Sequence, residues 1–171
     1  MSTTIWTTRA ETAADADAVR AINLAAFDTP GEADLVDALR ADPTAWIDGL
    51  SLVAVDEEDR PVGHALLTRC HIDGTPALAL APCAVLPSHQ RTGAGAAAIR
   101  AALRAAAALG ERHVVVLGHP TYYPRFGFER ASQHGIKLSI EVPDEALMAL
   151  ALTPGDPLPS GLVHYPAAFG I

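Results

Sequence analysis

The sequence predicts an α/β fold of the α+β type, in which a mixed, mostly antiparallel central sheet is flanked by helices. Three observations lead to this prediction. Apolar runs at residues 50–56, 62–72 and 77–85 are joined by short turns, which is the pattern of an antiparallel meander. An Ala-rich stretch at 94–109 has the spacing of a helix. The all-apolar run HVVVL at 113–117 is typical of a strand in the middle of a sheet.

The N-terminal part is expected to supply one more strand and two helices. Residues 4–9 alternate as a strand does, whereas residues 13–27 place their apolar side chains on one helical stripe. Residues 32–41 repeat the helical spacing, and the helix is expected to end near Pro43. Each helix would therefore have one apolar face to pack against the sheet.

The C-terminal part is Pro-rich but does not have the composition of a linker. Residues 137–142 and 161–169 are expected to form a closing hairpin, and the apolar run after Pro143 is expected to be helical. These segments would cover the substrate pocket.

Pro82 lies inside the third apolar run of the meander. A residue without an N–H cannot complete the hydrogen-bond ladder of a central strand. We therefore expect a bulge or a local separation of strands at this position.

Length and composition indicate one domain that spans residues 1–171. The chain has 171 residues, 50% hydrophobic and 19% charged, which suffices for one sizeable core. It has no basic segment followed by an apolar core and no apolar run of about 18 residues, so we expect a cytoplasmic protein with no membrane partner. The two cysteines, Cys70 and Cys83, lie in apolar runs and form no zinc framework, so no metal is expected.

The net charge of −8 argues against nucleic acid as a partner, because such proteins carry a basic patch. Any anionic ligand must then be held by a local positive site. Arg100 and Arg104 lie four residues apart on the Ala-rich helix, where arginines are ordinarily solvated, and we leave them out of the predicted site.

A glycine-bearing turn, QRTGAG at residues 90–95, joins the third apolar run to the Ala-rich helix. Small residues let the backbone approach a ligand, and the first N–H groups of a helix have no partner within the helix. The helix dipole also favours negative charge there, so residues 91–96 with Arg91 predict a phosphate site. The Gly-Lys-Ser/Thr of kinase-type phosphate loops is absent, and the dinucleotide fingerprint is incomplete.

The same turn matches the pattern Gln/Arg-x-x-Gly-x-Gly/Ala of the GCN5-related N-acetyltransferase (GNAT) superfamily. With LAPCAVLPSHQRTGAG, VVVLGHPTYYPRFGF and VHYPAAF, almost the whole chain resembles the bacterial YhbS-like branch of that superfamily. The resemblance implies a GNAT fold of six to seven strands whose fourth and fifth strands splay apart, with the break at Pro82. The pantetheine arm of acetyl-CoA would lie in the opening.

The resemblance also implies which residues form the site. Tyr123 stands four residues before Gly127 of the Gly-Phe turn, where a tyrosine in many relatives protonates the departing thiolate. A backbone N–H of the splayed strand would hold the oxyanion. The expected cofactor-binding residues are Cys83, Ala84, Val85, Gln90, Arg91, Thr92, Gly93, Ala94, Gly95 and Ala96.

The activity implied is that of an acyl-CoA-dependent N-acyltransferase, which moves acetyl from acetyl-CoA to a primary amine by direct attack through a tetrahedral intermediate. An acyl-cysteine route through Cys83 is disfavoured, because strand burial lowers thiol reactivity and no partner base is evident. The alternative is a non-catalytic acyl-CoA-binding or partner-binding module on the same fold.

Several features stay open at the level of sequence. The acceptor is either a small-molecule amine or a protein amino group. His64, His71, His89 and His119 are all candidates for the general base, and none of them is favoured. A homodimer is common in the superfamily, and the sequence does not decide the oligomeric state.

Overall fold

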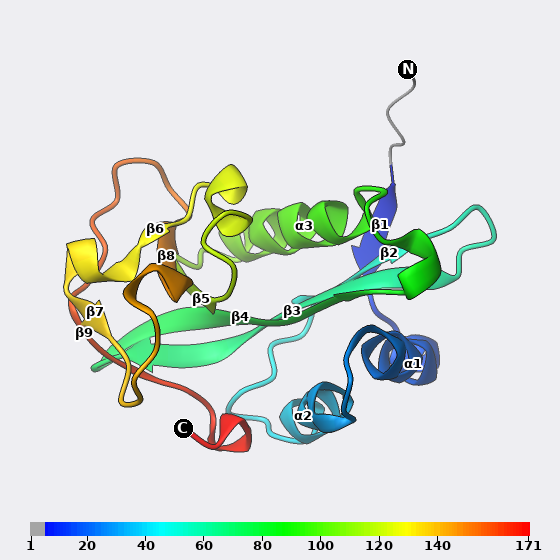
Figure 1. The fold of residues 1–171 in the computed structure, drawn as a ribbon, viewed down its shortest axis with the longest axis horizontal. Coiled ribbons are helices and arrows are strands. Elements are labelled where there is room, and N and C mark those ends of the chain that lie inside the picture. Colours follow the sequence, from blue (N-terminus) through cyan, green and yellow to red (C-terminus); the bar gives the residue numbers. More distant parts are fainter. Residues whose placement is uncertain (1–5) are drawn as a thin grey trace.

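The computed structural model describes residues 6–171 and confirms the predicted fold class. The described residues form nine strands and three α-helices (Figure 1). The strands are β1 (Thr7–Ala10), β2 (Ser51–Val55), β3 (Pro61–Ile72), β4 (Thr75–Val85), β5 (His113–Leu117), β6 (Glu129–Arg130), β7 (Ile136–Lys137), β8 (Leu147–Ala151) and β9 (Gly161–His164). The helices are α1 (Ala16–Ala26), α2 (Gly31–Arg40) and α3 (Ala94–Ala108).

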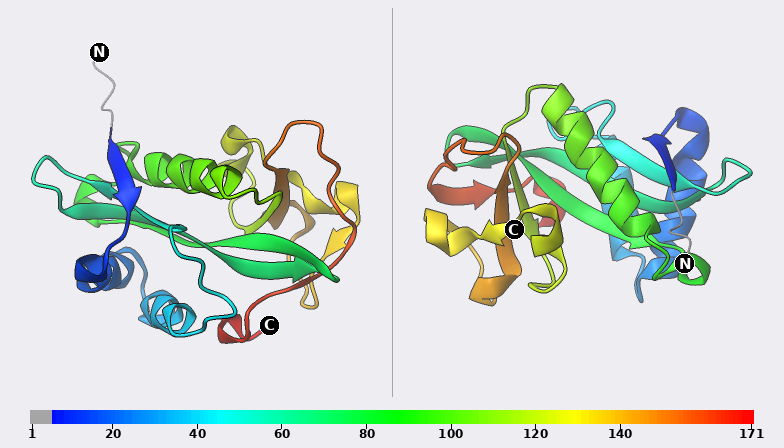
Figure 2. Two further views of the ribbon diagram at one scale, coloured as in Figure 1. Left: turned by 180° about the vertical axis from the view of Figure 1, so that it is seen from behind. Right: turned by 90° about the horizontal axis from the view of Figure 1, so that it is seen from above.

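The main path of the sheet runs β1-β2-β3-β4-β5-β8-β6, and β9 joins it beside β3 while also pairing with β7. All neighbours along the main path are antiparallel except β4 and β5, which are parallel. Helix α3 covers one face of the sheet, and α1 and α2 cover the other, as Figures 1 and 2 show. The sheet is therefore the middle layer of three.

Helix α3 lies close to the sheet because small side chains face it. Ala98, Ala102 and Ala106 recur every fourth residue and are fully buried. On the strand side, a Cβ at Gly63 would stand 3.4 Å from the carbonyl oxygen of Ala94. This short spacing fixes the height of the first turn of α3 above β3 and β4.

Strands β4 and β5 separate soon after they meet, as predicted. Their ladder consists of two residue pairs, Leu78 with Val114 and Ala79 with Val115. Pro82 lies three residues further along β4, beside a register shift in the pairing with β3, so the predicted bulge is present. In the described part of the chain β4 and β5 do not pair beyond Ala79, and the edge of β4 that faces β5 is open from there to Val85.

The expected closing hairpin is wrong. Of residues 137–142, only Lys137 is in a strand, namely β7, and β7 pairs with β9 in parallel. The other neighbour of β9 is β3, so the two C-terminal strands do not form a hairpin. The strand predicted at 161–169 ends at His164, and the short 3-10 helix η6 follows at Ala167–Phe169.

The helix expected after Pro143 is also wrong. Only the short 3-10 helix η5 (Asp144–Ala146) is helical there, and the apolar run that follows is strand β8. A short run of apolar residues has no period that distinguishes a buried strand from a helix, and pairing with β5 along five residues decides the outcome.

The N-terminal predictions hold within a few residues. Strand β1 begins at Thr7, and residues 4 and 5 of the predicted strand lie outside the described residues. The stripe predicted at 13–27 is a 3-10 turn followed by α1, and α2 ends at Arg40.

A buried polar network links the sheet to α1. The fully buried His64 has its Nε2 2.8 Å from Ser51 Oγ and its Nδ1 3.3 Å from Asn23 Nδ2. The Asn23 amide also donates to a carbonyl of its own helix, so His64 Nδ1 accepts and Nε2 donates to Ser51. The Ser51 hydroxyl in turn donates to Glu11, which is paired with Arg40 at 2.9 Å. Burial, and secondarily Arg40, lowers the pKa of His64 to about 3.

Acid is therefore expected to destabilise the fold through His64. Below pH about 6.5 the His64 side chain binds a proton in the unfolded chain but stays neutral in the folded protein. The contribution of His64 to the free energy of unfolding is therefore fully present above that pH and is lost as the pH is lowered toward 3. In urea unfolding at pH 7, 6 and 5, this group should lower the free energy of unfolding by about 0.7 kcal/mol over the first step and about 1.2 kcal/mol over the second, approaching a limit of about 1.4 kcal/mol per pH unit at lower pH. His64→Gln should remove this contribution to the dependence of the free energy of unfolding on pH. His71→Gln, at an exposed histidine, is the control and should leave the dependence unchanged. An unchanged slope in His64→Gln would contradict the burial argument.

Candidate active site

A cavity of about 710 Å³ lies where β4 and β5 part. Its walls come from the end of α1, the open edge of β4, the first turns of α3, and the segment between β5 and the 3-10 helix η3 (Tyr123–Phe126). Seven of the predicted site residues line it: Cys83, Ala84, Val85, Gln90, Arg91, Gly95 and Tyr123. Five further residues line it, of which only His119 was named from the sequence, as one of four candidate bases: Ala26, Phe27, Ile99, His119 and Tyr122.

The open edge of β4 directs backbone groups toward the cavity. Leu86 donates its N–H to β3 at 2.8 Å, and antiparallel ladders alternate, so Ala84 also points toward β3. Cys83 and Val85 consequently turn their N–H and C=O groups to the other side. The Val85 carbonyl already accepts a long hydrogen bond from Gln90 Nε2 at 3.4 Å. The N–H groups of Cys83 and Val85 therefore face the gap between β4 and β5.

The turn before α3 is held in an uncommon backbone conformation. Arg91 has φ of 63° and Gly93 has φ of 88°, both in the left-handed region. The Thr92 hydroxyl donates to the His89 carbonyl at 2.5 Å, and the Trp6 indole donates to the Thr92 carbonyl at 3.0 Å. Within residues 6–171 no side chain caps α3, so the first N–H groups of the helix remain available to a ligand.

Four predicted residues belong to this turn but do not line the cavity. Thr92 and Gly93 are exposed, and they give the turn its shape. The side chain of Ala94 is buried in the core under α3, and Ala96 is half-buried on the helix. For these residues only backbone N–H groups can reach a bound anion.

Tyr123 stands at the end of the cavity nearest Cys83. Its ring lies directly on Gly118, where a Cβ would overlap it, and meets Phe128 edge-on at a centroid distance of 5.9 Å. The phenol contacts the Cys83 thiol. Burial raises the pKa of Tyr123 above its usual range, and the neighbouring thiol adds to the shift. The phenol is therefore protonated at neutral pH and can donate a hydrogen bond into the cavity.

Cys83 is a poor nucleophile in this position. Burial raises the pKa of its thiol to about 12, and the hydrogen bond with Tyr123 offsets only part of that rise. The reactive thiolate is therefore scarce at neutral pH, which agrees with the sequence argument against an acyl-cysteine.

Gly95 lets the other tyrosine approach the start of α3. A Cβ at Gly95 would stand 2.9 Å from Val85 Cγ2 and 3.8 Å from the Tyr122 hydroxyl. Tyr122 thus forms a wall beside the turn, and the Tyr123 ring, whose phenol contacts Cys83, meets the Tyr122 ring edge-on at a centroid distance of 5.1 Å.

Only one of the four candidate histidines lines the cavity. His119 does so and is exposed. His64 is buried between the sheet and α1, and His71 lies at the far end of β3 opposite β9. His89 begins the turn before α3, with its Nδ1 2.8 Å from the hydroxyl of the preceding serine.

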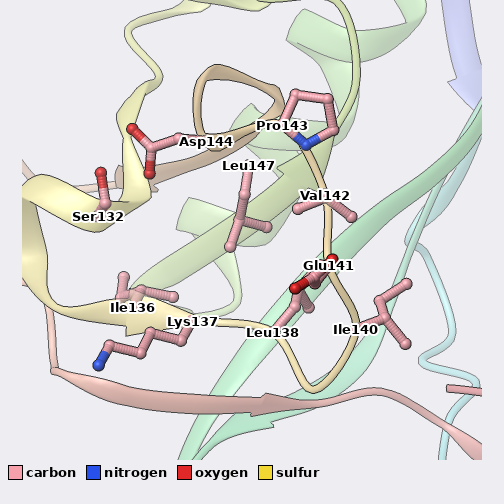
Figure 3. A pocket seen from close by; sticks show the side chains of 10 residues that line it. All are labelled: Ser132, Ile136, Lys137, Leu138, Ile140, Glu141, Val142, Pro143, Asp144 and Leu147. Carbon is pink, nitrogen blue, oxygen red and sulfur yellow. The ribbon is translucent and has the colours of Figure 1, made fainter.

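Two further cavities continue from the first along the C-terminal loops. A cavity of about 370 Å³ shares His119 with it and is lined on its other side by Val142 and Pro143. Those two residues also line a cavity of about 650 Å³, whose walls include Lys137 and Glu141 (Figure 3). None of the predicted site residues lies in these two cavities, which extend away from Tyr123.

The polar groups of the main cavity are backbone N–H groups, phenols, an imidazole and a guanidinium. Groups of this kind can bind phosphate and stabilise a developing oxyanion. Within residues 6–171 no set of three or more His, Cys, Asp or Glu side chains is arranged to hold a metal ion. None of the helices in that part of the chain is long and apolar enough to cross a bilayer.

Comparison with known families identifies this arrangement. The model of the acetyltransferase (GNAT) family matches residues 16–128, from α1 to the end of the Tyr123 segment. The chain belongs to the acetyltransferase (GNAT) family. The expected N-acetyltransferase class is thereby confirmed.

Relatives of this GNAT protein include two from Escherichia coli. It is 40% identical to the uncharacterized N-acetyltransferase YjhQ over 136 residues, which cover 77% of this chain and 74% of YjhQ. It is 31% identical to the uncharacterized N-acetyltransferase YhbS over 131 residues, which cover 75% of this chain and 77% of YhbS. The expected YhbS-like branch is therefore confirmed.

Solved structures of GNAT proteins superpose over nearly the whole chain. The crystal structure of Escherichia coli YhbS in complex with CoA has a TM-score of 0.87 at 28% identity, covering 97% of this chain and 92% of that one. A GNAT family acetyltransferase from Brucella melitensis in complex with acetyl-CoA has a TM-score of 0.78 at 32% identity, covering 96% and 98%.

The contact between Gly118 and the Tyr123 ring leads to a testable prediction. Gly118→Ala inserts a methyl group where the ring lies, so the ring must shift, and the variant should lose about 1–3 kcal/mol of unfolding free energy. Gly74→Ala is the matched control, because a Cβ there meets nothing within 4 Å. Urea unfolding measures both variants, and equal stability of the two would contradict the packing described for Tyr123.

Proposed function

We propose that this GNAT protein, acting as one domain that spans residues 1–171, transfers the acetyl group of acetyl-CoA to a primary amine without a covalent enzyme intermediate. One observation carries the proposal: a single cavity brings together the open edge of β4, the turn before α3 and the Tyr123 phenol. The relatives crystallised with CoA and acetyl-CoA support the choice of cosubstrate.

In this proposal the backbone of residues 91–96, with Arg91, binds the diphosphate of acetyl-CoA. Unpaired N–H groups at a helix start and the helix dipole both favour an anion there. The pantetheine arm lies along β4 and pairs with the backbone of Cys83 and Val85 as an added strand would. The cavity volume of about 710 Å³ lies within the range of small-molecule sites.

The chemistry proposed is direct aminolysis of the thioester. The neutral amine attacks the carbonyl carbon, a C–N bond forms, and the carbonyl oxygen becomes an oxyanion that the N–H of Cys83 or Val85 stabilises. Collapse of the intermediate breaks the C–S bond and expels the thiolate. The protonated phenol of Tyr123 donates its proton to the sulfur and is reprotonated from solvent, while the nitrogen loses one proton to solvent.

The acceptor would enter beside Phe27 and His119, two lining residues that have no part in the proposed binding of acetyl-CoA. His119 is also where the next cavity begins, so the rim continues toward Val142 and Pro143. A rim of this length accommodates a small-molecule amine or an amino group at the end of a protein chain. Both classes therefore belong in an acceptor screen.

Tyr123→Phe should lower kcat by about 10²–10⁴-fold, because the departing thiolate loses its proton donor, while the Kd for acetyl-CoA stays unchanged. Thiol release with an amine panel and calorimetric titration with acetyl-CoA measure the two effects. Tyr122→Phe, which alters the wall beside the turn, is the matched control and should affect kcat far less.

The same experiment distinguishes the proposed enzyme from a non-catalytic acyl-CoA-binding module. If Tyr123→Phe weakens turnover and binding equally, the general-acid role is wrong. If the wild-type protein binds acetyl-CoA but releases no thiol with any amine, binding without turnover is the better description.

A further inference from the structure

Within residues 6–171 the arginines without an acidic partner lie on α3, on the turn before it and on η3. The chain has eleven arginines and one lysine against 20 acidic residues. Seven arginines form ion pairs with carboxylates: Arg9, Arg20, Arg40, Arg60, Arg69, Arg112 and Arg130. Within residues 6–171 the other four have no carboxylate within ion-pair distance, and they are Arg91, Arg100, Arg104 and Arg125. In a chain of net charge −8, this grouping requires an explanation.

Two of these arginines lie over neighbouring aromatic rings at the junction of α3 and η3. The guanidinium of Arg100 is 5.1 Å from the ring centroid of Phe126, and that of Arg125 is 4.3 Å from the ring centroid of Tyr122. The two rings contact each other edge-on at 5.4 Å.

Both side chains are oriented by contacts that leave hydrogen-bond donors free. Arg125 Nε donates to the Tyr122 carbonyl at 2.8 Å, so its terminal nitrogens remain available. Arg100 is held by the Phe126 ring and makes no hydrogen bond to a carboxylate in the described part of the chain. Burial raises the pKa of Tyr122, and the charges of Arg125 and Arg100 both oppose that rise, so both guanidiniums act on one phenol.

We propose that Arg100 and Arg125 bind the 3′-phosphate of coenzyme A and make the enzyme select CoA over its 3′-dephospho form, an inference that rests on the proposed function. Two guanidiniums that lie over contacting aromatic rings and have no counter-ion among the described residues can together bind a doubly charged phosphate. Arg100 comes five residues after Gly95, which is about 7.5 Å along α3. A diphosphate on the turn therefore places the ribose and its 3′-phosphate beside this pair.

Calorimetric titration of the wild-type protein with CoA and with 3′-dephospho-CoA tests the proposal. The wild type should bind CoA at least about tenfold more tightly, since hydrogen bonds to a charged phosphate are lost in the dephospho form. Arg100→Gln and Arg125→Gln should each reduce the ratio, and the double variant should bring it close to one. Affinity for 3′-dephospho-CoA should stay the same in all of them.

Arg104→Gln is the matched control, because Arg104 is an exposed arginine one turn further along the same helix that contacts no aromatic ring. Its ratio should equal that of the wild type. A wild type that binds both ligands equally would overturn the 3′-phosphate assignment alone, whereas a wild type that binds neither would overturn the proposed function with it.

Three other outcomes would also reject the assignment. The first is an unchanged ratio in the double variant. The second is an equal loss of affinity for CoA and 3′-dephospho-CoA in Arg125→Gln, which indicates that Arg125 holds Tyr122 in place without contacting the 3′-phosphate. The third is an unchanged ratio together with a raised KM for acidic acceptors, which indicates that the arginines bind the acceptor.

Discussion

The separation of two parallel strands after only two residue pairs is the constraint on which the rest of the site depends. Beyond these pairs β4 continues with a partner, β3, on one side only, and Pro82 lies beside a register shift in that remaining pairing. A half-buried strand edge with unpaired backbone groups costs free energy unless something else bonds to it. The amide-bearing arm of a coenzyme A thioester would supply those bonds. The interruption that weakens the sheet is thus also the feature that makes it able to bind.

Three glycines allow the close packing that positions the groups around this gap. The absence of a Cβ at Gly63 lets the first turn of α3 approach β3, and its absence at Gly95 lets Val85 and Tyr122 meet that turn. At Gly118 it makes room for the ring of Tyr123. Close backbone packing therefore holds the anion-binding turn and the Tyr123 phenol in the walls of one cavity. Ion pairs contribute little to this arrangement, because the arginines nearest the cavity have no acidic partner.

The fold class, the elements up to residue 117 and the glycine turn could be predicted from the sequence, because they depend on local patterns. The spacing from the Gly-Phe turn likewise singles out Tyr123 as a candidate. Strand β8 was mistaken for a helix, since an apolar run of this length has no decisive period and its pairing with β5 is non-local. Phe27 reaches the cavity from the end of α1 through the course of the chain, which no pattern encodes, and the structure is needed to single out His119 among the four candidate histidines. Arg100 appeared to be an ordinary solvated residue, and only its place relative to the ion pairs of the whole chain distinguishes it.

A crystal structure of the protein with acetyl-CoA tests the central claim most directly. The diphosphate oxygens should accept hydrogen bonds from the backbone at residues 91–96. The thioester sulfur should lie within hydrogen-bond reach of the Tyr123 hydroxyl, and the acetyl oxygen should face the N–H of Cys83 or Val85. Acetyl-CoA bound in the cavity beside Val142 and Pro143, or in the main cavity with its sulfur turned away from Tyr123, would contradict the account.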